Sequence, residues 1–111
     1  VNMDFKTYQK DSRRTAKYSD VGKNFIYPTL GLASEAGEVA GKVKKIMRDD
    51  NMNVSEEKRE QIKDELGDVL WYVAQTATEF KLDLEEIAKD NLAKLLFRLE
   101  RGVIGGSGDN R

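Results

Sequence analysis

The chain has 111 residues and a formal net charge of −1, with 19 Lys and Arg against 20 Asp and Glu. This length suits one domain, which we place at residues 1–104, followed by a Gly-rich tail at 105–111. The balanced charge argues against a dedicated nucleic-acid binder, and no apolar run approaches the roughly 20 residues of a membrane span. The absence of Cys and His excludes disulfides, a thiolate nucleophile and the commonest general base. We expect a cytoplasmic protein with neither nucleic acid nor membrane as a partner.

Apolar residues spaced three and four apart, with a single Pro, predict an all-α chain. We expect a first helix over about residues 3–18, where the apolar stripe is weak, and then a turn at SDVGKN. Pro28 suits the first turn of a second helix that runs to about Arg48, since the N–H that Pro lacks has no partner there. The segment DDNMN then separates this helix from the next one.

Ser55 can cap a third helix, which runs to about Phe80. Asp83 can cap a fourth helix, which Gly102 ends. Four helices joined by short links predict a four-helix bundle-like fold. The small core and the weak first stripe indicate that a homodimer or homotetramer completes this fold.

Two acidic pairs of equal spacing lie within these helical patterns. Glu35 and Glu38 occur in LASEAGEV, and Glu65 and Asp68 occur in KDELGDVLW. On a helical wheel each pair lies at one border of the apolar arc of its helix, and it is the same border in both helices. If the two helices pack antiparallel around a common core, a local two-fold brings both edges to the same side. The sequence therefore predicts a cage of four carboxylates.

Such a cage is costly without a cation, because two unit charges about 4 Å apart repel by roughly 4 kcal/mol at an effective dielectric near 20. Ligands that are all oxygen favour Mg²⁺, with Mn²⁺ as a substitute, and Mg²⁺ commonly binds together with substrate phosphates. The alternative interpretation is that both pairs lie on ordinary solvated helix faces and form no site. A di-iron or di-manganese carboxylate bundle is disfavoured, because it needs Glu-x-x-His motifs and the chain has no His.

The fourth helix carries the opposite chemistry on the equivalent edge. Asn91, Lys94 and Arg98 border its apolar arc. Cations on this edge can bind phosphate oxygens that a metal leaves free, Arg through its planar fork. They can equally be a basic helix end that complements the helix dipole.

Aromatic side chains follow the second acidic pair along the third helix. Trp71 and Tyr72 lie three and four residues after Asp68, so they flank the acidic edge and can stack on a nucleobase or pack between subunits. For Trp71 we favour packing. Phe25 and Tyr27, with Tyr8 or Gln9 from the first helix, are further candidates for a base pocket, although core or cap positions are the commoner roles of such residues.

These motifs resemble the all-α nucleotide pyrophosphohydrolases of the MazG-like type. The similarity rests on GLASEAGEVAGKVKK, DELGDVLWYV, NLAKLLFR and the closing RGVIGGSGDNR. The resemblance implies that Glu35, Glu38, Glu65 and Asp68 bind Mg²⁺ and that Asn91, Lys94 and Arg98 contact the triphosphate. It also implies hydrolysis of a (d)NTP between the α- and β-phosphates, giving the (d)NMP and pyrophosphate. Some members place another acidic residue where this chain has Ser34.

The residues themselves agree with a hydrolase of this kind. Without His or Cys, the simplest nucleophile is a water activated by bound metal, with a carboxylate as its base. Either Glu35 or Glu38 can take that catalytic role. The alternative is a non-enzymatic helical interaction protein with acidic surface edges, whose melting temperature Mg²⁺ would leave unchanged.

Overall fold

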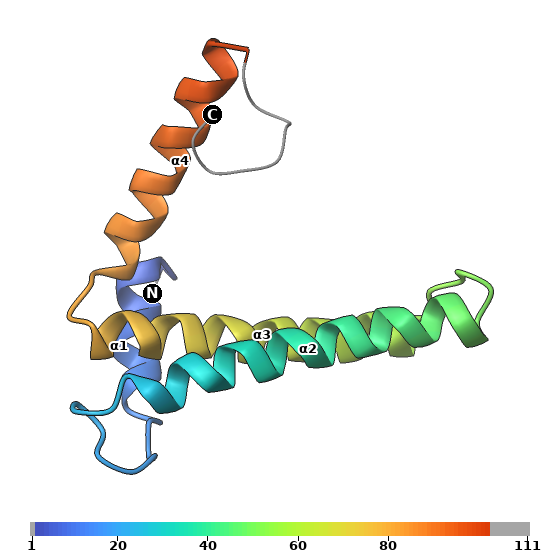
Figure 1. The fold of residues 1–111 in the computed structure, drawn as a ribbon, viewed down its shortest axis with the longest axis horizontal. Helices are drawn as coiled ribbons and strands as arrows, with labels where there is room; N and C mark the ends of the chain where they lie inside the picture. Colours follow the sequence, from blue (N-terminus) through green and yellow to red (C-terminus); the bar gives the residue numbers. More distant parts are fainter. Residues whose placement is uncertain (1, 103–111) are drawn as a thin grey trace.

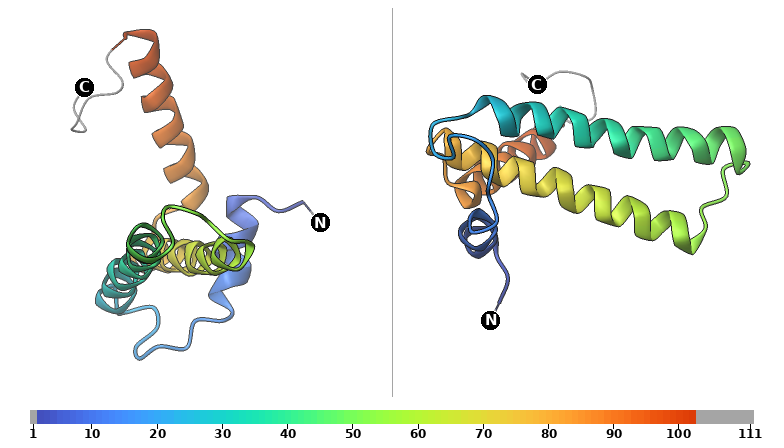
Figure 2. Two further views of the ribbon diagram at one scale, coloured as in Figure 1. Left: turned by 90° about the vertical axis from the view of Figure 1, so that its right-hand side faces the viewer. Right: turned by 90° about the horizontal axis from the view of Figure 1, so that it is seen from below.

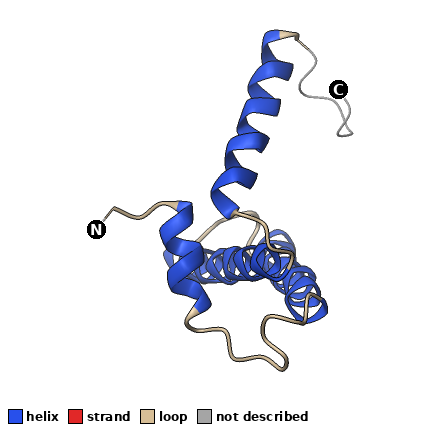
Figure 3. Cartoon of the chain, turned by 90° about the vertical axis from the view of Figure 1, so that its left-hand side faces the viewer, coloured by secondary structure: helices blue, strands red, loops and turns tan. Residues whose placement is uncertain are grey.

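The computed structural model describes residues 2–102, and this part of the chain is all-helical, with no strand (Figure 3). Its four helices are α1 (Phe5–Arg13), α2 (Ile26–Asp49), α3 (Glu56–Glu79) and α4 (Leu84–Glu100). None of them is long and apolar enough to cross a membrane. The predicted tail at 105–111, and with it the end of the domain at 104, lies outside the described residues.

Helices α2 and α3 form a long antiparallel hairpin (Figures 1 and 2). Asn51 and Met52 adopt left-handed backbone conformations between them, with φ of 56° and 66°. As predicted, Ser55 caps α3, because its side chain accepts a hydrogen bond from the Lys58 amide at 3.1 Å. As predicted, Pro28 lies in the first turn of α2, which begins at Ile26.

Helix α1 is shorter than the predicted 3–18, and residues 14–25 form a loop. The difference has a tertiary cause, since Tyr18 leaves the helical path and its hydroxyl bonds to Arg13 and Glu79. Those long-range bonds replace the local ones that another turn of helix would make.

Helix α4 turns away from the hairpin, as Figure 1 shows. Lys81, with φ of 60°, ends α3. Gln9 of α1 then fixes the corner, because its side chain donates to the Leu82 carbonyl at 2.9 Å and accepts from the Leu84 amide at 2.9 Å. Helix α4 contacts α1 and α3 but not α2. The predicted all-α class with four helices is thus confirmed for residues 2–102, and within one chain these helices do not close into a bundle.

The buried core is small and lies where α1, α3 and the start of α4 meet. Its apolar members within the described residues include Ala16, Ala74, Ala77 and Leu84, with Ile46 buried at the far end of the hairpin. The apolar arc predicted for α4 is instead exposed, with Leu92 at 57%, Leu96 at 52% and Leu99 at 59%. The sequence placed these leucines in a core that a single chain does not supply.

Candidate metal and nucleotide site

Three of the four predicted carboxylates converge between α2 and α3. One oxygen each from Glu35, Glu65 and Asp68 lies within 4.8 Å of the other two. Glu35 comes from α2, whereas Glu65 and Asp68 lie one helical turn apart on α3. The antiparallel pairing brings the two edges together, as the wheel analysis predicted. We call these three residues the acidic triad.

Glu38 does not join the triad. It is exposed on α2, one turn beyond Glu35. Its charge nevertheless contributes to the raised pKa of Glu35. The predicted cage of four carboxylates is therefore a group of three, with a fourth carboxylate beside it.

Mutual repulsion in the triad is visible in the pKa of Glu35. A hydrogen bond with Glu65 raises this pKa most, followed by burial and then by the charges of Asp68, Glu65 and Glu38. The last three contributions come from the charges of neighbouring carboxylates, which favour the protonated form of Glu35. The triad is therefore an electrostatically unfavourable arrangement in the absence of a cation.

The donor set of the triad fits a hard divalent cation. All its ligand atoms are carboxylate oxygens, which suit Mg²⁺ or Mn²⁺ and are poor ligands for softer metals. Three carboxylates leave coordination positions for waters and phosphate oxygens. The geometry is thus compatible with a divalent cation that also contacts an anionic substrate.

Tyr72 lies one helical turn from Asp68 and packs across α2 beside the triad. Its ring occupies the space over Gly31, where an added Cβ would come within 2.1 Å of the Tyr72 Cε1. Gly31 in turn lies one turn before Glu35. Burial raises the pKa of the Tyr72 phenol, and Tyr27, Glu35 and Asp68 raise it further. Tyr72 therefore belongs to the layer next to the acidic triad.

Trp71 lies on a different side of α3 from Tyr72. Its indole Nε1 donates to the Thr15 hydroxyl at 2.8 Å, and its ring meets Tyr18 and Tyr72 edge-on. These contacts lie within one chain, so the packing between subunits that we favoured for Trp71 stays a prediction. Burial and the charge of Asp68 raise the pKa of the Tyr8 phenol in α1.

The basic edge of α4 does not meet the triad within one chain. Asn91 and Lys94 are exposed, and Arg98 is half-buried. Their helix makes no contact with α2 and rises away from the hairpin (Figure 1). Within one chain the basic edge therefore stays apart from the acidic triad, because the corner fixed by Gln9 directs α4 away from the hairpin.

Comparison with known proteins assigns this arrangement to a family. The model of the MazG nucleotide pyrophosphohydrolase domain matches residues 28–103, a range that includes the acidic triad and the basic edge of α4. The chain belongs to the MazG nucleotide pyrophosphohydrolase family. Among curated proteins, it is similar to the "Gene 37 protein" of Mycobacterium phage L5, with 47% identity over 109 residues that cover 94% of this chain and 96% of the relative. No solved structure matches the chain significantly.

Two features of this MazG-family domain escaped the sequence reasoning. Gly31 leaves room for the Tyr72 ring because it has no Cβ. The only local sign of this role is its position one helical turn before Glu35. Glu79 collects hydrogen bonds from residues 55 to 66 positions earlier in the chain. No spacing rule reveals partners at such separations, because only the tertiary fold brings them together.

Proposed function

We propose that the chain is a Mg²⁺-dependent hydrolase that cleaves (d)NTPs between the α- and β-phosphates, giving the (d)NMP and pyrophosphate. The observation that carries this proposal is the convergence of Glu35, Glu65 and Asp68 within a MazG domain. An anionic substrate cannot approach three carboxylates unless a cation intervenes. Mg²⁺, or Mn²⁺ in its place, is therefore part of the proposal.

In this mechanism the three residues of the triad hold the cation. When bound, Mg²⁺ lowers the pKa of a coordinated water and offsets charge on the phosphate oxygens. Glu38 is the better candidate for the base, since its carboxylate stands beside the triad but outside it. It would accept the proton of the attacking water, while Glu35 acts as a ligand.

A second copy of the chain would supply the phosphate-binding residues. The apolar arc of α4 is exposed, and so are Val43 and Met47 of α2 and Leu66 of α3. The basic edge lies beside the apolar arc of α4, and the acidic triad lies on the hairpin of α2 and α3, so the two surfaces have complementary charge. We infer a homodimer, or a homotetramer built from it, in which α4 packs on the partner's hairpin and brings Asn91, Lys94 and Arg98 to the partner's triad.

Tyr72 is the aromatic residue best placed to contact the base, because it lies in the layer next to the triad. Stacking on an aromatic ring tolerates any base, since every base has a π-face. Tyr72 would thus add affinity without selecting the base by hydrogen bonds. Trp71 would act indirectly, through its packing on Tyr72.

Hydrolysis of individual dNTPs with Mg²⁺, followed by identification of the products, tests this function. We expect pyrophosphate and the monophosphate from the wild type, and a loss of roughly 100-fold or more in Glu65→Gln, as for other removals of electrostatic stabilisation. Asp64→Asn is the matched control, since Asp64 is the exposed neighbour of Glu65 and lies outside the triad. Free phosphate as the primary product, or full activity of Glu65→Gln, would contradict the proposal.

A further inference from the structure

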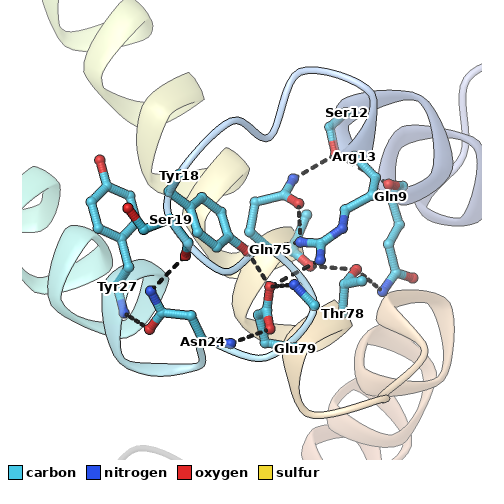
Figure 4. A network of polar contacts seen from close by, with 12 residues as sticks. Gln9, Ser12, Arg13, Tyr18, Ser19, Asn24, Tyr27, Gln75, Thr78 and Glu79 are labelled. Carbon is cyan, nitrogen blue, oxygen red and sulfur yellow. Dashed lines mark hydrogen bonds and ion pairs between the residues drawn. The ribbon is translucent and has the colours of Figure 1, made fainter.

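A buried carboxylate outside the acidic triad organises the C-terminal end of α3. Glu79 is the last residue of this helix, and its side chain is 1% exposed. It accepts hydrogen bonds from the Tyr18 hydroxyl at 2.5 Å, Arg13 Nη2 at 2.9 Å, the Gly22 amide at 2.8 Å and the Asn24 amide at 3.0 Å (Figure 4). Four donors on one carboxylate fix its position, so Glu79 can hold in place the segments that carry these donors.

The carboxylate shapes the loop that leads into α2. Two of its donors are backbone amides of this loop, and Gly22 adopts φ of 93°, which favours glycine. Asn24 then links the loop to α2, because its side chain accepts from the Tyr27 amide at 3.1 Å and donates to the Ser19 carbonyl at 2.9 Å. Glu79 therefore fixes where the first turn of α2 begins.

The same carboxylate orients an aromatic stack. Tyr18, whose hydroxyl donates to Glu79, stacks on Tyr27 with ring centroids 4.9 Å apart and planes inclined by 20°. Tyr27 lies next to Tyr72, at 6.4 Å between centroids. A chain of contacts thus runs from Glu79 through Tyr18 and Tyr27 to Tyr72, the ring beside the triad.

Tyr27 lies on the same helix as Glu35 and continues, away from the triad, the aromatic layer that begins at Tyr72. It precedes Glu35 by eight residues of α2, which corresponds to about 12 Å along the helix. This span is of the order of the separation between the base and the terminal phosphates of an extended nucleotide. Tyr27 is 47% exposed, so part of its ring remains accessible although Tyr18 stacks on it.

We propose that Glu79 is a positioning residue that holds Tyr27, through Tyr18 and the 14–25 loop, as part of the wall that contacts the nucleobase. This inference rests on the proposed function, since it places the base of the same substrate. Glu79 itself touches neither substrate nor cation. Its loss should weaken the contribution of the base to binding while the triphosphate contribution stays.

Measuring the affinity of two ligands in the presence of Mg²⁺ separates the contribution of the base from that of the triphosphate. One ligand is the set of α,β-imido analogues of the four common dNTPs, and the other is inorganic tripolyphosphate, which has no base. In Tyr27→Ala and Glu79→Gln we expect roughly tenfold weaker nucleotide binding, within the range for one lost base stack, and unchanged tripolyphosphate binding. Tyr18→Phe keeps the ring but removes the hydroxyl, so it serves if Glu79→Gln does not fold by circular dichroism.

A double variant tests whether Glu79 acts through Tyr27. In the Tyr27→Ala background, Glu79→Gln should cause no further loss of nucleotide binding, because residues that act as a unit are not additive. Asp49→Asn is the matched control, since it removes a carboxylate from an exposed Arg pair at the other end of the hairpin. Its binding of both ligands should equal that of the wild type.

Three results would overturn the inference. The first is wild-type nucleotide binding in both Glu79→Gln and Tyr18→Phe. The second is an equal weakening of both ligands, which would give Glu79 a role in folding alone. If the wild type binds neither ligand, the proposed function fails, and this inference fails with it. The tripolyphosphate measurement on the wild type distinguishes the two failures.

Discussion

Acid should destabilise this fold through Glu79 in a defined pH window. Burial alone would raise the pKa of this carboxyl, but hydrogen bonds from Tyr18, Gly22, Arg13 and Asn24 outweigh it and lower the pKa to about 2, from an ordinary value of 4.5. A lowered pKa contributes stability that is fully present above the unfolded-state value and is lost as the pH falls toward the folded-state value. The contribution of Glu79 should therefore disappear between about pH 4.5 and pH 2.

The size of the effect follows from the same two pKa values. A change from 4.5 to about 2 corresponds to roughly 3 kcal/mol, since each pKa unit is worth about 1.4 kcal/mol. The side chain is 1% exposed, so solvent screening reduces this figure little. For a domain of this size, 3 kcal/mol is a large part of a typical stability of about 5–15 kcal/mol.

Urea unfolding followed by circular dichroism between pH 7 and pH 2 measures the effect. We expect Glu79→Gln to be less stable than the wild type at pH 7 by about 3 kcal/mol, with the two curves converging near pH 2. The control Asp49→Asn, which removes an exposed carboxylate from its pair with Arg48, should follow the wild-type curve closely. If the Glu79→Gln curve stays parallel to the wild-type curve down to pH 2, the assignment of a strongly lowered pKa is refuted.

Three further outcomes are expected. Gly31→Ala should lower the free energy of unfolding by about 1–3 kcal/mol in urea and reduce hydrolysis, because the added methyl group would displace the Tyr72 ring. The control Gly37→Ala has open space around its Cβ and should raise stability by up to about 1 kcal/mol. Equal effects of the two substitutions would contradict this account. Without Mg²⁺, Glu65→Gln should melt at a higher temperature than the wild type, because it relieves repulsion in the triad, and it should gain less from added Mg²⁺; a lower melting temperature without Mg²⁺ would count against that repulsion. Mixing inactive Glu65→Gln and Arg98→Ala chains should restore up to about a quarter of wild-type activity if the partner's α4 completes each site, and no activity if both edges belong to one chain.

The acidic triad could be predicted from the sequence because local rules determine it. Residues three apart share a helix face, and the short DDNMN link makes α2 and α3 antiparallel neighbours. Two pairs on matching edges therefore had to approach each other. The wheel could not show that Glu38 stands outside the group, since a difference of one helical turn depends on how the two helices are shifted along each other.

The direction of α4 could not be predicted, because it depends on contacts between distant parts of the chain. Gln9 fixes the corner through a bond to Leu82, which lies 73 residues away. The end of α1 has a similar cause, since Arg13 and Tyr18 bond to Glu79 instead of continuing the helix. Periodicity indicates which face of a helix is apolar, but it does not indicate which chain covers that face.

The distribution of contacts along the chain links stability to assembly. The polar network around Glu79 and Gln75 holds α1, the 14–25 loop and the end of α3 together, and the small core lies at the same end. The long arms, formed by the rest of the hairpin and by α4, expose apolar side chains next to charged edges of opposite sign. Burying these faces requires a second copy in the proposed dimer, and the same contact would bring cations to the acidic triad. Assembly and completion of the site would then be one event, so hydrolysis per chain should fall upon dilution below the dimer dissociation constant.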